Sequence, residues 1–414
     1  MRKFFLALLL ALPVLLPAQA QPMAVPADAP APAPLAAERP APQIVLLTFA
    51  PGPVYWQRFG HNALLVRDIA NGEDRVYNYG IFDFHQKNFF LNFARGHMQY
   101  RLAVEPLADT LAQYQYEGRW VQAQELNLEP AQARELAAFL DWNARPENAE
   151  YRYDYFLSNC STRVRDAIDR VTGGQLRQQM ESQPTAVTYR HEATRLISPV
   201  LPMFLAMDST VAAQGDRPIN RWQQSFVPMV LMRAVPELRL RDAAGVERPL
   251  LRGEARVLQG GLPEPEHPRS MLATMTLLGL GLAAVLLLLS RFRAAAAARW
   301  SLSGLALLLN LAAGLGGLAL LSIWFLTDHW VMHRNFNLLL FSPLCLALLP
   351  SWLRQFRAGA AVGRAGRKLV LLLAGGAALA LPLLLLPGAQ QNLHWIALLL
   401  PVHAAQAWIL ARKS

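Results

Sequence analysis

The stretch from Tyr153 to Asp166 reads YDYFLSNCSTRVRD and places Cys160 at the start of a predicted helix. Asn159 is a favourable N-cap residue. The apolar residues that follow recur at helical spacing, at Val164, Ala167, Ile168 and Val171. Counting back four residues from Val164 puts Cys160 in the first turn, on the face that turns toward the rest of the domain. The free amides and the dipole of a helix N-terminus favour an anion, so we expect a lowered pKa and a nucleophilic thiolate.

The C-terminal third of the chain is strongly apolar and holds most of the net charge of +10. Residues 271 to 414 carry 11 basic residues and a single acid, Asp328. Five apolar stretches are each near the length that a membrane helix requires. We expect spans at residues 271–289, 302–326, 336–353, 369–387 and 393–410. The high isoelectric point therefore reflects charges between hydrophobic segments and does not indicate nucleic-acid binding.

The connections between these stretches alternate in charge. Basic residues gather in 290–301, in 354–368 and in the C-terminal tail, whereas Arg334 alone lies in the second connection and none lies in the fourth. The positive-inside rule makes the basic side cytoplasmic. Five spans then place the C-terminus in the cytoplasm and the segment before residue 271 outside, in the periplasm of a bacterial inner membrane protein.

The N-terminus independently predicts export. Residues 1–20 combine Arg2 and Lys3 with a short apolar run and a small-residue cleavage site at Ala18 to Ala20, as a signal peptide does. Residues 21–42 are rich in Ala and Pro and are expected to form an extended tether. A folded extracytoplasmic domain should then occupy residues 43–268.

Topology bears on the function of Cys160. Structural cysteines in an oxidising compartment usually occur in pairs, but Cys345 falls inside the third predicted span and cannot reach Cys160. Two interpretations follow: a chemically active thiol, or a small buried residue.

The exported domain is predicted to be α+β, with an antiparallel sheet and helices. Short β-like runs occupy roughly residues 43–50, 61–69, 75–84, 98–107 and 120–128, with turn signals between several of them. A helix is expected from Pro130, which suits a first helical position, until Pro146.

A thiol nucleophile commonly needs a base and a residue that orients it. His61 directly follows Gly60 at the start of a predicted strand, where a side chain can be held rigidly. Asn78, on the strand expected beside it, could accept a hydrogen bond from the imidazole, and Asp83 is the competitor for this role.

Asn159, Arg163 and Arg165 lie close to Cys160 in the sequence and are the candidate substrate-binding residues. The two arginines could receive a phosphate or carboxylate. Equally, they could form a solvated helix face.

No metal or cofactor is expected from the motifs. The sequence contains no ligand spacing typical of zinc sites, and Asp328, His329 and His333 form only a loose cluster in a predicted exterior loop. That loop, with Trp324 and Trp330, could instead be an interfacial belt at headgroup level.

The motifs FGHNALLV, VYNYGIFDF, YDYFLSNCSTRVRD and TDHWVMHRNFNLLLFSP together resemble the family named after the lipoprotein intramolecular transacylase Lnb. The order of His61 and then Cys160 is also similar to circularly permuted, papain-like NlpC-type proteins, which include lecithin–retinol-type acyltransferases. The resemblance implies a permuted papain-like domain in which Cys160 is the nucleophile and His61 the base. It also implies that an acyl chain passes from the glycerol of a lipoprotein to the thiol and then to an amine.

Three functions are therefore considered. The first is a membrane-anchored extracytoplasmic thiol acyltransferase whose partners are membrane lipids or a lipoprotein. The second is a cell-wall cysteine peptidase or amidase that uses the same residues. The third is a non-catalytic envelope binding protein, for which replacement of Cys160 by serine would leave function intact.

Overall fold

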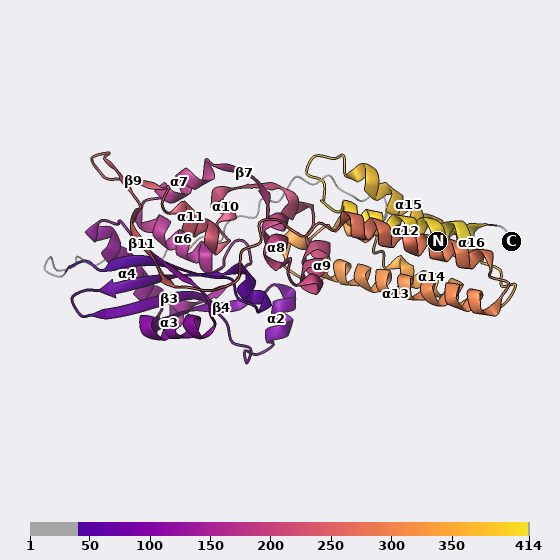
Figure 1. Cartoon of the computed structure of the whole chain (residues 1–414), viewed down its shortest axis with the longest axis horizontal. Coiled ribbons are helices and arrows are strands. Elements are labelled where there is room, and N and C mark those ends of the chain that lie inside the picture. Colours follow the sequence, from indigo (N-terminus) through magenta and orange to yellow (C-terminus); the bar gives the residue numbers. More distant parts are fainter. Residues whose placement is uncertain (1–39, 413–414) are drawn as a thin grey trace.

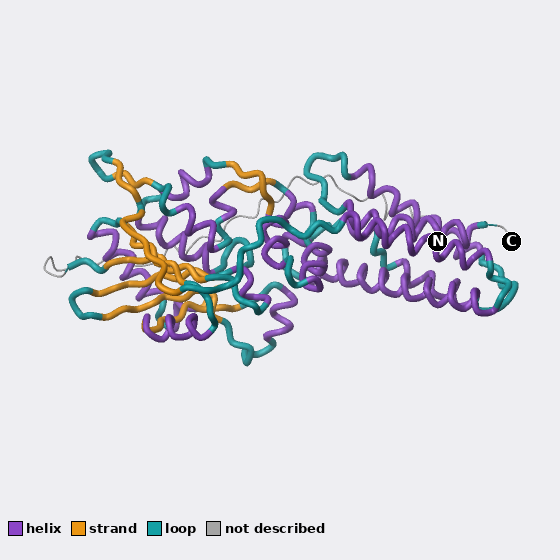
Figure 2. Tube along the Cα trace, in the orientation of Figure 1, coloured by secondary structure: helices purple, strands orange, loops and turns teal. Residues whose placement is uncertain are grey.

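The computed structural model describes residues 40–412, which form an α+β part followed by a bundle of long helices (Figure 1). The expected signal peptide and residues 21–39 of the tether lie outside the described residues. Figure 2 shows that strands are confined to the first part and that the second part is helical. The predicted fold class, an exported α+β domain before a five-span helical domain, is confirmed at this level.

A seven-stranded sheet forms the centre of the exported domain. Its strands lie in the order β11-β5-β1-β2-β3-β4-β6, and every neighbouring pair is antiparallel. Their bounds are β1 Gln43–Phe49, β2 His61–Asp68, β3 Glu73–Ile81, β4 Gln99–Pro106, β5 Val121–Leu126, β6 Glu150–Arg152 and β11 Leu251–Leu258. The first five correspond to the predicted runs, and β6 and β11 extend the sheet at its two edges.

Side chains alternate between the two faces of this sheet, and each face packs against helices. Leu46 and Leu64 lie in the larger core with α4 (Pro130–Asn143), α6 (Cys160–Val171) and α11 (Pro228–Ala234). Val45 and Leu65 lie in a second core with α3 (Leu107–Tyr116). The sheet is therefore covered on both faces, with α6 and α3 on opposite sides of the strands that carry His61 and Asn78 (Figure 1).

Shorter elements complete the exported domain. They are η1 Tyr55–Phe59, α2 Phe89–Arg95, α5 Pro146–Ala149, α7 Gln175–Glu181, β7 Pro184–Thr188, α8 Tyr189–Ile197, α9 Leu201–Thr210, η2 Ala213–Asp216, β8 Pro218–Asn220, α10 Arg221–Gln224, β9 Arg239–Arg241 and β10 Glu247–Pro249. Of these, α8 and α9 lie nearest to the helical bundle in Figure 1.

The bundle has five segments that are long and apolar enough to cross a membrane. Four contain the long helices α12 Leu272–Arg291, α13 Ala296–Leu326, α15 Arg364–Leu383 and α16 Leu393–Ala411. The remaining segment, Trp330–Arg354, contains η3 Trp330–Met332, η4 Phe336–Leu339 and α14 Leu344–Arg354.

The third segment differs from the continuous span predicted at 336–353. Only its second half is α-helical, because polar side chains at its start bond elsewhere: Asn335 Nδ2 donates to Ser209 O at 2.9 Å, and Asn337 Nδ2 donates to the same oxygen at 2.9 Å. At 11 residues, α14 is about 16 Å long, roughly half the hydrocarbon thickness. The irregular half is packed within the protein, as backbone at membrane depth must be.

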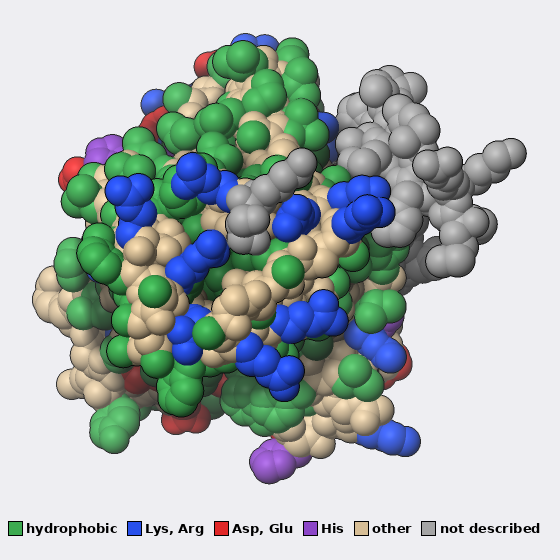
Figure 3. All heavy atoms as spheres, turned by 90° about the vertical axis from the view of Figure 1, so that its right-hand side faces the viewer, with side chains coloured by type: hydrophobic (Ala, Val, Ile, Leu, Met, Phe, Trp, Pro, Cys, Tyr) green, Lys and Arg blue, Asp and Glu red, His purple; other side chains and the backbone are tan. Residues whose placement is uncertain are grey.

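The end of the bundle distant from the sheet is rich in basic side chains. Figure 3 views this end directly and shows Lys and Arg side chains interspersed with hydrophobic ones. Arg299, near the start of α13, donates through Nε to Phe356 O at 3.0 Å, which ties two of the basic connections together. The predicted separation of charge along the bundle is thus present in three dimensions.

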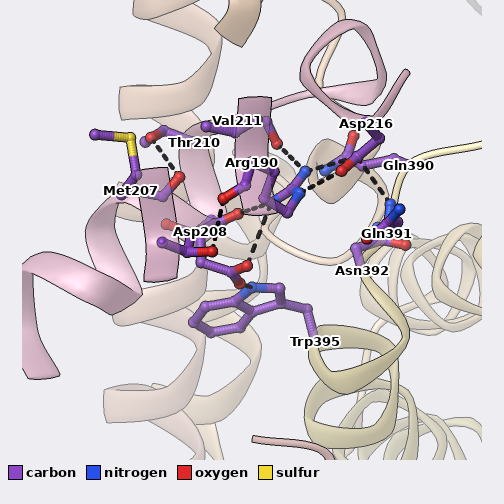
Figure 4. A network of polar contacts seen from close by, with 12 residues as sticks. Arg190, Met207, Asp208, Thr210, Val211, Asp216, Gln390, Gln391, Asn392 and Trp395 are labelled. Carbon is purple, nitrogen blue, oxygen red and sulfur yellow. Dashed lines mark hydrogen bonds and ion pairs between the residues drawn. The ribbon is translucent and has the colours of Figure 1, made fainter. Parts of the chain in front are cut away.

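A buried polar network joins the exported domain to the other end of the bundle (Figure 4). Arg190 Nε of α8 lies 2.6 Å from Asp216 Oδ1, and its other nitrogens bond to Asp208 and to backbone carbonyls. Trp395 Nε1 of α16 donates to Asp208 Oδ2 at 2.7 Å, and the Gln391 amide donates to Asp216 Oδ2 at 2.9 Å. Because buried charges need partners, this network fixes the orientation of the two parts.

Candidate active site

Cys160 is the first residue of α6, and a capping box holds it there. The Asn159 side chain accepts from the Thr162 amide at 2.9 Å, while Thr162 Oγ1 accepts from the Asn159 amide at 2.8 Å. Asn159 Nδ2 also donates to Phe226 O at 2.9 Å, which anchors the cap to the segment before α11. The predicted helix start is correct, and Cys160 is a free cysteine, partly exposed as a whole residue.

His61 is the first residue of β2. Its ring stacks on Phe49, the residue paired with it on β1, with 5.5 Å between ring centroids. The backbone N–H of the next residue, Asn62, lies close enough to the Cys160 sulfur to lower the pKa of the thiol. The buried Asn62 side chain donates through Nδ2 to Ser161 Oγ at 3.0 Å. Asn62, directly after His61, is therefore bonded to Ser161, directly after Cys160, so the start of β2 lies against the start of α6.

Asn78 orients the imidazole. His61 Nε2 lies 3.1 Å from Asn78 Oδ1, and Asn78 Nδ2 lies 3.3 Å from Glu105 Oε2. Because the amide nitrogen of Asn78 faces the Glu105 carboxylate, its oxygen is the atom that accepts from His61 Nε2–H. This tautomer leaves Nδ1 as the ring nitrogen that can take a proton. Glu105 extends the chain of contacts and was not singled out by the sequence.

The charge state of the pair differs from the prediction. Burial raises the pKa of the Cys160 thiol to about 11, and the backbone N–H donors of Asn62 and Ser161 lower it only in part. Burial also lowers the pKa of His61 to about 4, with the bond to Asn78 acting in the opposite direction and Arg119 adding to the lowering. The expectation of a lowered thiol pKa is thus wrong, because desolvation outweighs the helix terminus. At neutral pH the pair is a thiol and a neutral imidazole.

Tyrosines surround the thiol on the side of β3. A Cβ added at Gly80 would lie 3.5 Å from Cys160 Cβ and 3.9 Å from both the Tyr151 hydroxyl oxygen and the Tyr153 ring. Burial, followed by the proximity of Cys160, raises the pKa of Tyr151 well above its ordinary value. Among residues 40–412, the buried Tyr151 hydroxyl finds no hydrogen-bond partner. This donor beside the sulfur was not singled out by the sequence.

The two candidate arginines have partners within the fold. Arg165 is buried and stacks over the Trp222 ring. One of its amino groups donates to Trp222 O at 2.6 Å, and the other donates to Asp166 Oδ1 at 2.7 Å. Arg163 donates to Ser158 Oγ at 3.1 Å and lies over the Tyr151 ring. With Asn159 engaged in capping, a substrate contact by any of the three stays a prediction.

Other predicted polar residues lie elsewhere. Asp83 lies in an exposed turn and accepts from the His85 amide at 2.8 Å, so Asn78 is the candidate bonded to His61.

The loop after α13 is held by contacts with the exported domain, and its placement as a belt at headgroup level stays a prediction. It docks on the exported domain through Asp328, which contacts Arg152 Nη2 at 2.6 Å and His97 Nε2 at 3.0 Å. Trp330 Nε1 donates to Asp154 Oδ2 at 3.1 Å, and its ring packs on Phe156. In the described part of the chain, no group of three or more His, Cys, Asp or Glu residues is arranged to hold a metal ion.

Comparison with known families matches both parts of the chain. Residues 37–195 match the Lnb N-terminal periplasmic domain, and residues 270–411 match the Lnb transmembrane domain. The first match contains every residue of the candidate site, and the second contains all five candidate spans. Comparison with curated proteins and with solved structures found no match.

Proposed function

Because the chain belongs to the Lnb family, whose two domains it carries in order, we propose that it is a membrane-anchored thiol acyltransferase. Its donor would be the acyl ester of a lipoprotein or of a membrane lipid, and its acceptor an amine. The observation that carries this proposal is the arrangement of Cys160 at the start of α6, with the His61 strand end bonded to that helix start. The Asn78–Glu105 pair behind His61 supports it.

In the first step, the Cys160 sulfur attacks the carbonyl carbon of the acyl ester. The thiol proton passes to His61 Nδ1 during attack, as a thiol with a pKa of about 11 requires a base. The carbon–oxygen bond to the glycerol breaks, and the proton held by His61 passes to the leaving oxygen. The products are a thioester on Cys160 and a free hydroxyl on the donor.

In the second step, a neutral amine attacks the thioester carbon. A new amide bond forms and the carbon–sulfur bond breaks, while one amine proton returns through His61 to the sulfur. The backbone N–H groups of Asn62 and Ser161 and the unpartnered hydroxyl of Tyr151 lie close to Cys160 and could stabilise negative charge on the carbonyl oxygen.

We place this chemistry at the periplasmic face of a bacterial inner membrane, with the C-terminus in the cytoplasm. The basic side chains at the far end of the bundle support this orientation under the positive-inside rule (Figure 3). The exported domain would then stand above the outer leaflet, where acyl donors reside.

A labelling experiment tests the proposal. Membranes that contain the protein are treated with a long-chain acyl-thioester probe, and Cys160→Ala and His61→Ala are compared with the unaltered chain. Cys345→Ala is the matched control, because Cys345 is a buried thiol of the membrane bundle. We expect acyl labelling to vanish in Cys160→Ala, to fall by about 10²- to 10⁴-fold in rate in His61→Ala, and to persist in Cys345→Ala.

Acyl labelling that persisted without Cys160 would contradict a thiol mechanism. Labelling that depends on Cys160 while only peptides are turned over would instead favour the cell-wall amidase. Full biological activity of Cys160→Ser would favour a binding function.

A further inference from the structure

The exported domain exposes a patch of large apolar side chains around α2. We call it the aromatic patch and define it by Trp56, Phe84, Phe90, Leu91 and Phe93. Phe90 is 74% exposed, and Phe84 and Leu91 are each 48% exposed. Contiguous exposed apolar surface of this kind marks a contact with a protein or a membrane.

Ring contacts make this patch a single cluster. Phe84 lies 6.1 Å from Trp56 and 5.0 Å from Phe89 between ring centroids, and Phe89 lies 5.3 Å from Phe90 and 6.3 Å from Phe93. Residues from η1, from the turn after β3 and from α2 therefore present one surface.

The position of α2 relative to the bundle identifies what covers this surface. The backbone N–H of Asp328 donates to Arg95 O, the last residue of α2, at 2.8 Å, and His329 Nε2 lies 3.1 Å from Phe93 O. Asp328 follows the end of α13 at Leu326 by two residues. The patch is thus attached where a membrane-spanning helix leaves the hydrocarbon, as Figure 1 shows for α2 beside the near end of the bundle.

The composition of the segment fits a lipid surface. Exposed Lys87 and Arg95 flank the apolar residues, and basic residues beside Phe and Leu are typical of helices that lie in the membrane interface. The end of α13 adds exposed Phe325 and Leu326 near the same level.

A run of aromatic rings leads from the patch to the thiol. Phe89 lies 6.0 Å from Phe82, Phe82 lies 5.1 Å from Tyr100, and Tyr100 stacks on Tyr153 at 4.2 Å. Tyr153 borders the space at Gly80 that also adjoins Cys160 Cβ.

We propose that the aromatic patch inserts into the outer leaflet of the membrane and receives the acyl chain of a bilayer-embedded donor for transfer to Cys160. Insertion is independent of catalysis, whereas delivery of the chain rests on the proposed acyltransferase function.

Insertion is tested on the full chain in proteoliposomes. Phe90→Cys is made together with Cys160→Ala and Cys345→Ala, labelled with an environment-sensitive fluorophore, and reconstituted with lipids brominated along the acyl chain. The control is Val246→Cys in the same background, because Val246 is 62% exposed at the turn after β9, away from the bundle (Figure 1). We expect strong quenching at position 90 and none at 246. Equal, weak quenching at both positions overturns insertion.

Delivery is tested with two substrates. Phe90→Asp is compared with Ile69→Asp, a control at an exposed residue just after β2. We expect Phe90→Asp to lower turnover of a bilayer-embedded acyl donor by about tenfold or more, since it places a charge in the apolar interface. Turnover of a short, water-soluble acyl thioester should stay unchanged, and Ile69→Asp should match the unaltered protein with both.

The outcomes separate the two proposals. Unchanged turnover of the embedded donor by Phe90→Asp overturns delivery, and equal loss with both substrates also overturns it, because the patch would then support the site's structure only. If the unaltered chain turns over neither substrate, the acyltransferase function and delivery fail together, and the quenching result still decides insertion.

Discussion

His61 is buried and bonded to the neutral amide of Asn78, and both features set the pH at which its imidazole becomes protonated. An amide oxygen orients the imidazole without the full stabilisation of imidazolium that a carboxylate gives. Burial lowers the pKa of His61 to about 4, and the bond to Asn78 raises it only in part, so the imidazole is unprotonated across the neutral range. The rate should then fall only when the pH approaches about 4, where the imidazolium can no longer accept the thiol proton.

Replacing this amide with a carboxylate tests the relay. In Asn78→Asp, negative charge beside Nε2 raises the pKa of His61, so the acid limb of kcat/KM should move to higher pH. In Asn78→Ala, loss of the bond that raises the pKa should move the limb lower, and loss of orientation should cut kcat by up to about 10²-fold, the low end of what a positioned base supplies. Both profiles are measured with a soluble thioester. An acid limb that is identical in all three proteins would show that Asn78 does not act on His61.

The unpartnered hydroxyl of Tyr151 gives a second test. Tyr151→Phe should lower kcat by about tenfold or more, because a donor aimed at a developing oxyanion contributes in the transition state. Stability should be unchanged or slightly higher, since an unsatisfied buried hydroxyl is removed. Tyr79→Phe is the matched control: the Tyr79 hydroxyl donates to Asn143 Oδ1 at 2.7 Å, so its loss should lower the melting temperature while leaving kcat intact. The reverse pattern would assign Tyr151 a structural role only.

Some residues of the candidate site could be proposed from the sequence, whereas others were found only from their positions in the structure. Cys160 and His61 were candidates because each begins an element, and Asn78 because it follows on the neighbouring strand; their catalytic roles stay predictions. Glu105 and Tyr151 carry no local signal, since their relation to the site depends on the β3–β4 and β4–β6 registers. The thiol pKa was mispredicted for a related reason: the burial that raises it comes from residues far away in the chain.

Strand β3 is interrupted where it passes the thiol. Its register with β4 shifts between Asn78 and Ile81, and Gly80 adopts a φ of 91°. Glycine tolerates this backbone, and its missing side chain leaves room beside Cys160 and Tyr151. The glycine at this break thus leaves room beside Cys160 that a Cβ would fill at ordinary van der Waals distance.

Gly80→Ala should therefore block the site, and Gly72→Ala provides the control. Gly72 has a φ of 70° in the β2–β3 turn, and a Cβ there meets nothing within 4 Å. Both variants should be destabilised by about 1–2 kcal/mol for the left-handed backbone, measured by thermal melting. Only Gly80→Ala should also slow alkylation of Cys160 and acyl transfer. Equal alkylation rates in the two variants would show that the space at Gly80 does not serve the thiol.

Elements with a local repeat were predictable, and those set by distant partners were not. The short apolar runs of β1 and β2 and the helical spacing of α6 indicated those elements directly. By contrast, β11 pairs with β5 from more than a hundred residues away. The third membrane segment appeared continuous in hydropathy, yet Asn335 and Asn337 interrupt its helix because they bond to the carbonyl end of α9.

Charged and polar side chains join the exported domain to the bundle, in addition to the chain segment that connects them. Burial acts to raise the pKa of the Asp208 carboxyl. Hydrogen bonds from His394 and Trp395 of α16, together with the charge of Arg190, outweigh burial and hold this pKa below its usual range. The aromatic patch is attached at the same end of the bundle through Asp328. Under the proposed function, a fixed junction would keep both the patch and Cys160 at a constant height above the membrane, as a donor anchored in the bilayer requires.

Breaking this junction is expected to loosen the molecule as a whole. Arg190→Met leaves Asp216 and Asp208 buried without their main cation, and removal of one partner of a buried pair costs about 3–5 kcal/mol. The melting temperature in detergent should fall markedly, and protease should separate the exported domain from the bundle sooner. Arg241→Met is the control, because the exposed Arg241–Glu247 pair contributes at most about 1 kcal/mol.

With the soluble thioester, Arg190→Met should retain activity below its melting temperature, whereas turnover of a bilayer-embedded donor should fall. Equal retention with both substrates would mean that the height of the site above the membrane does not depend on the junction.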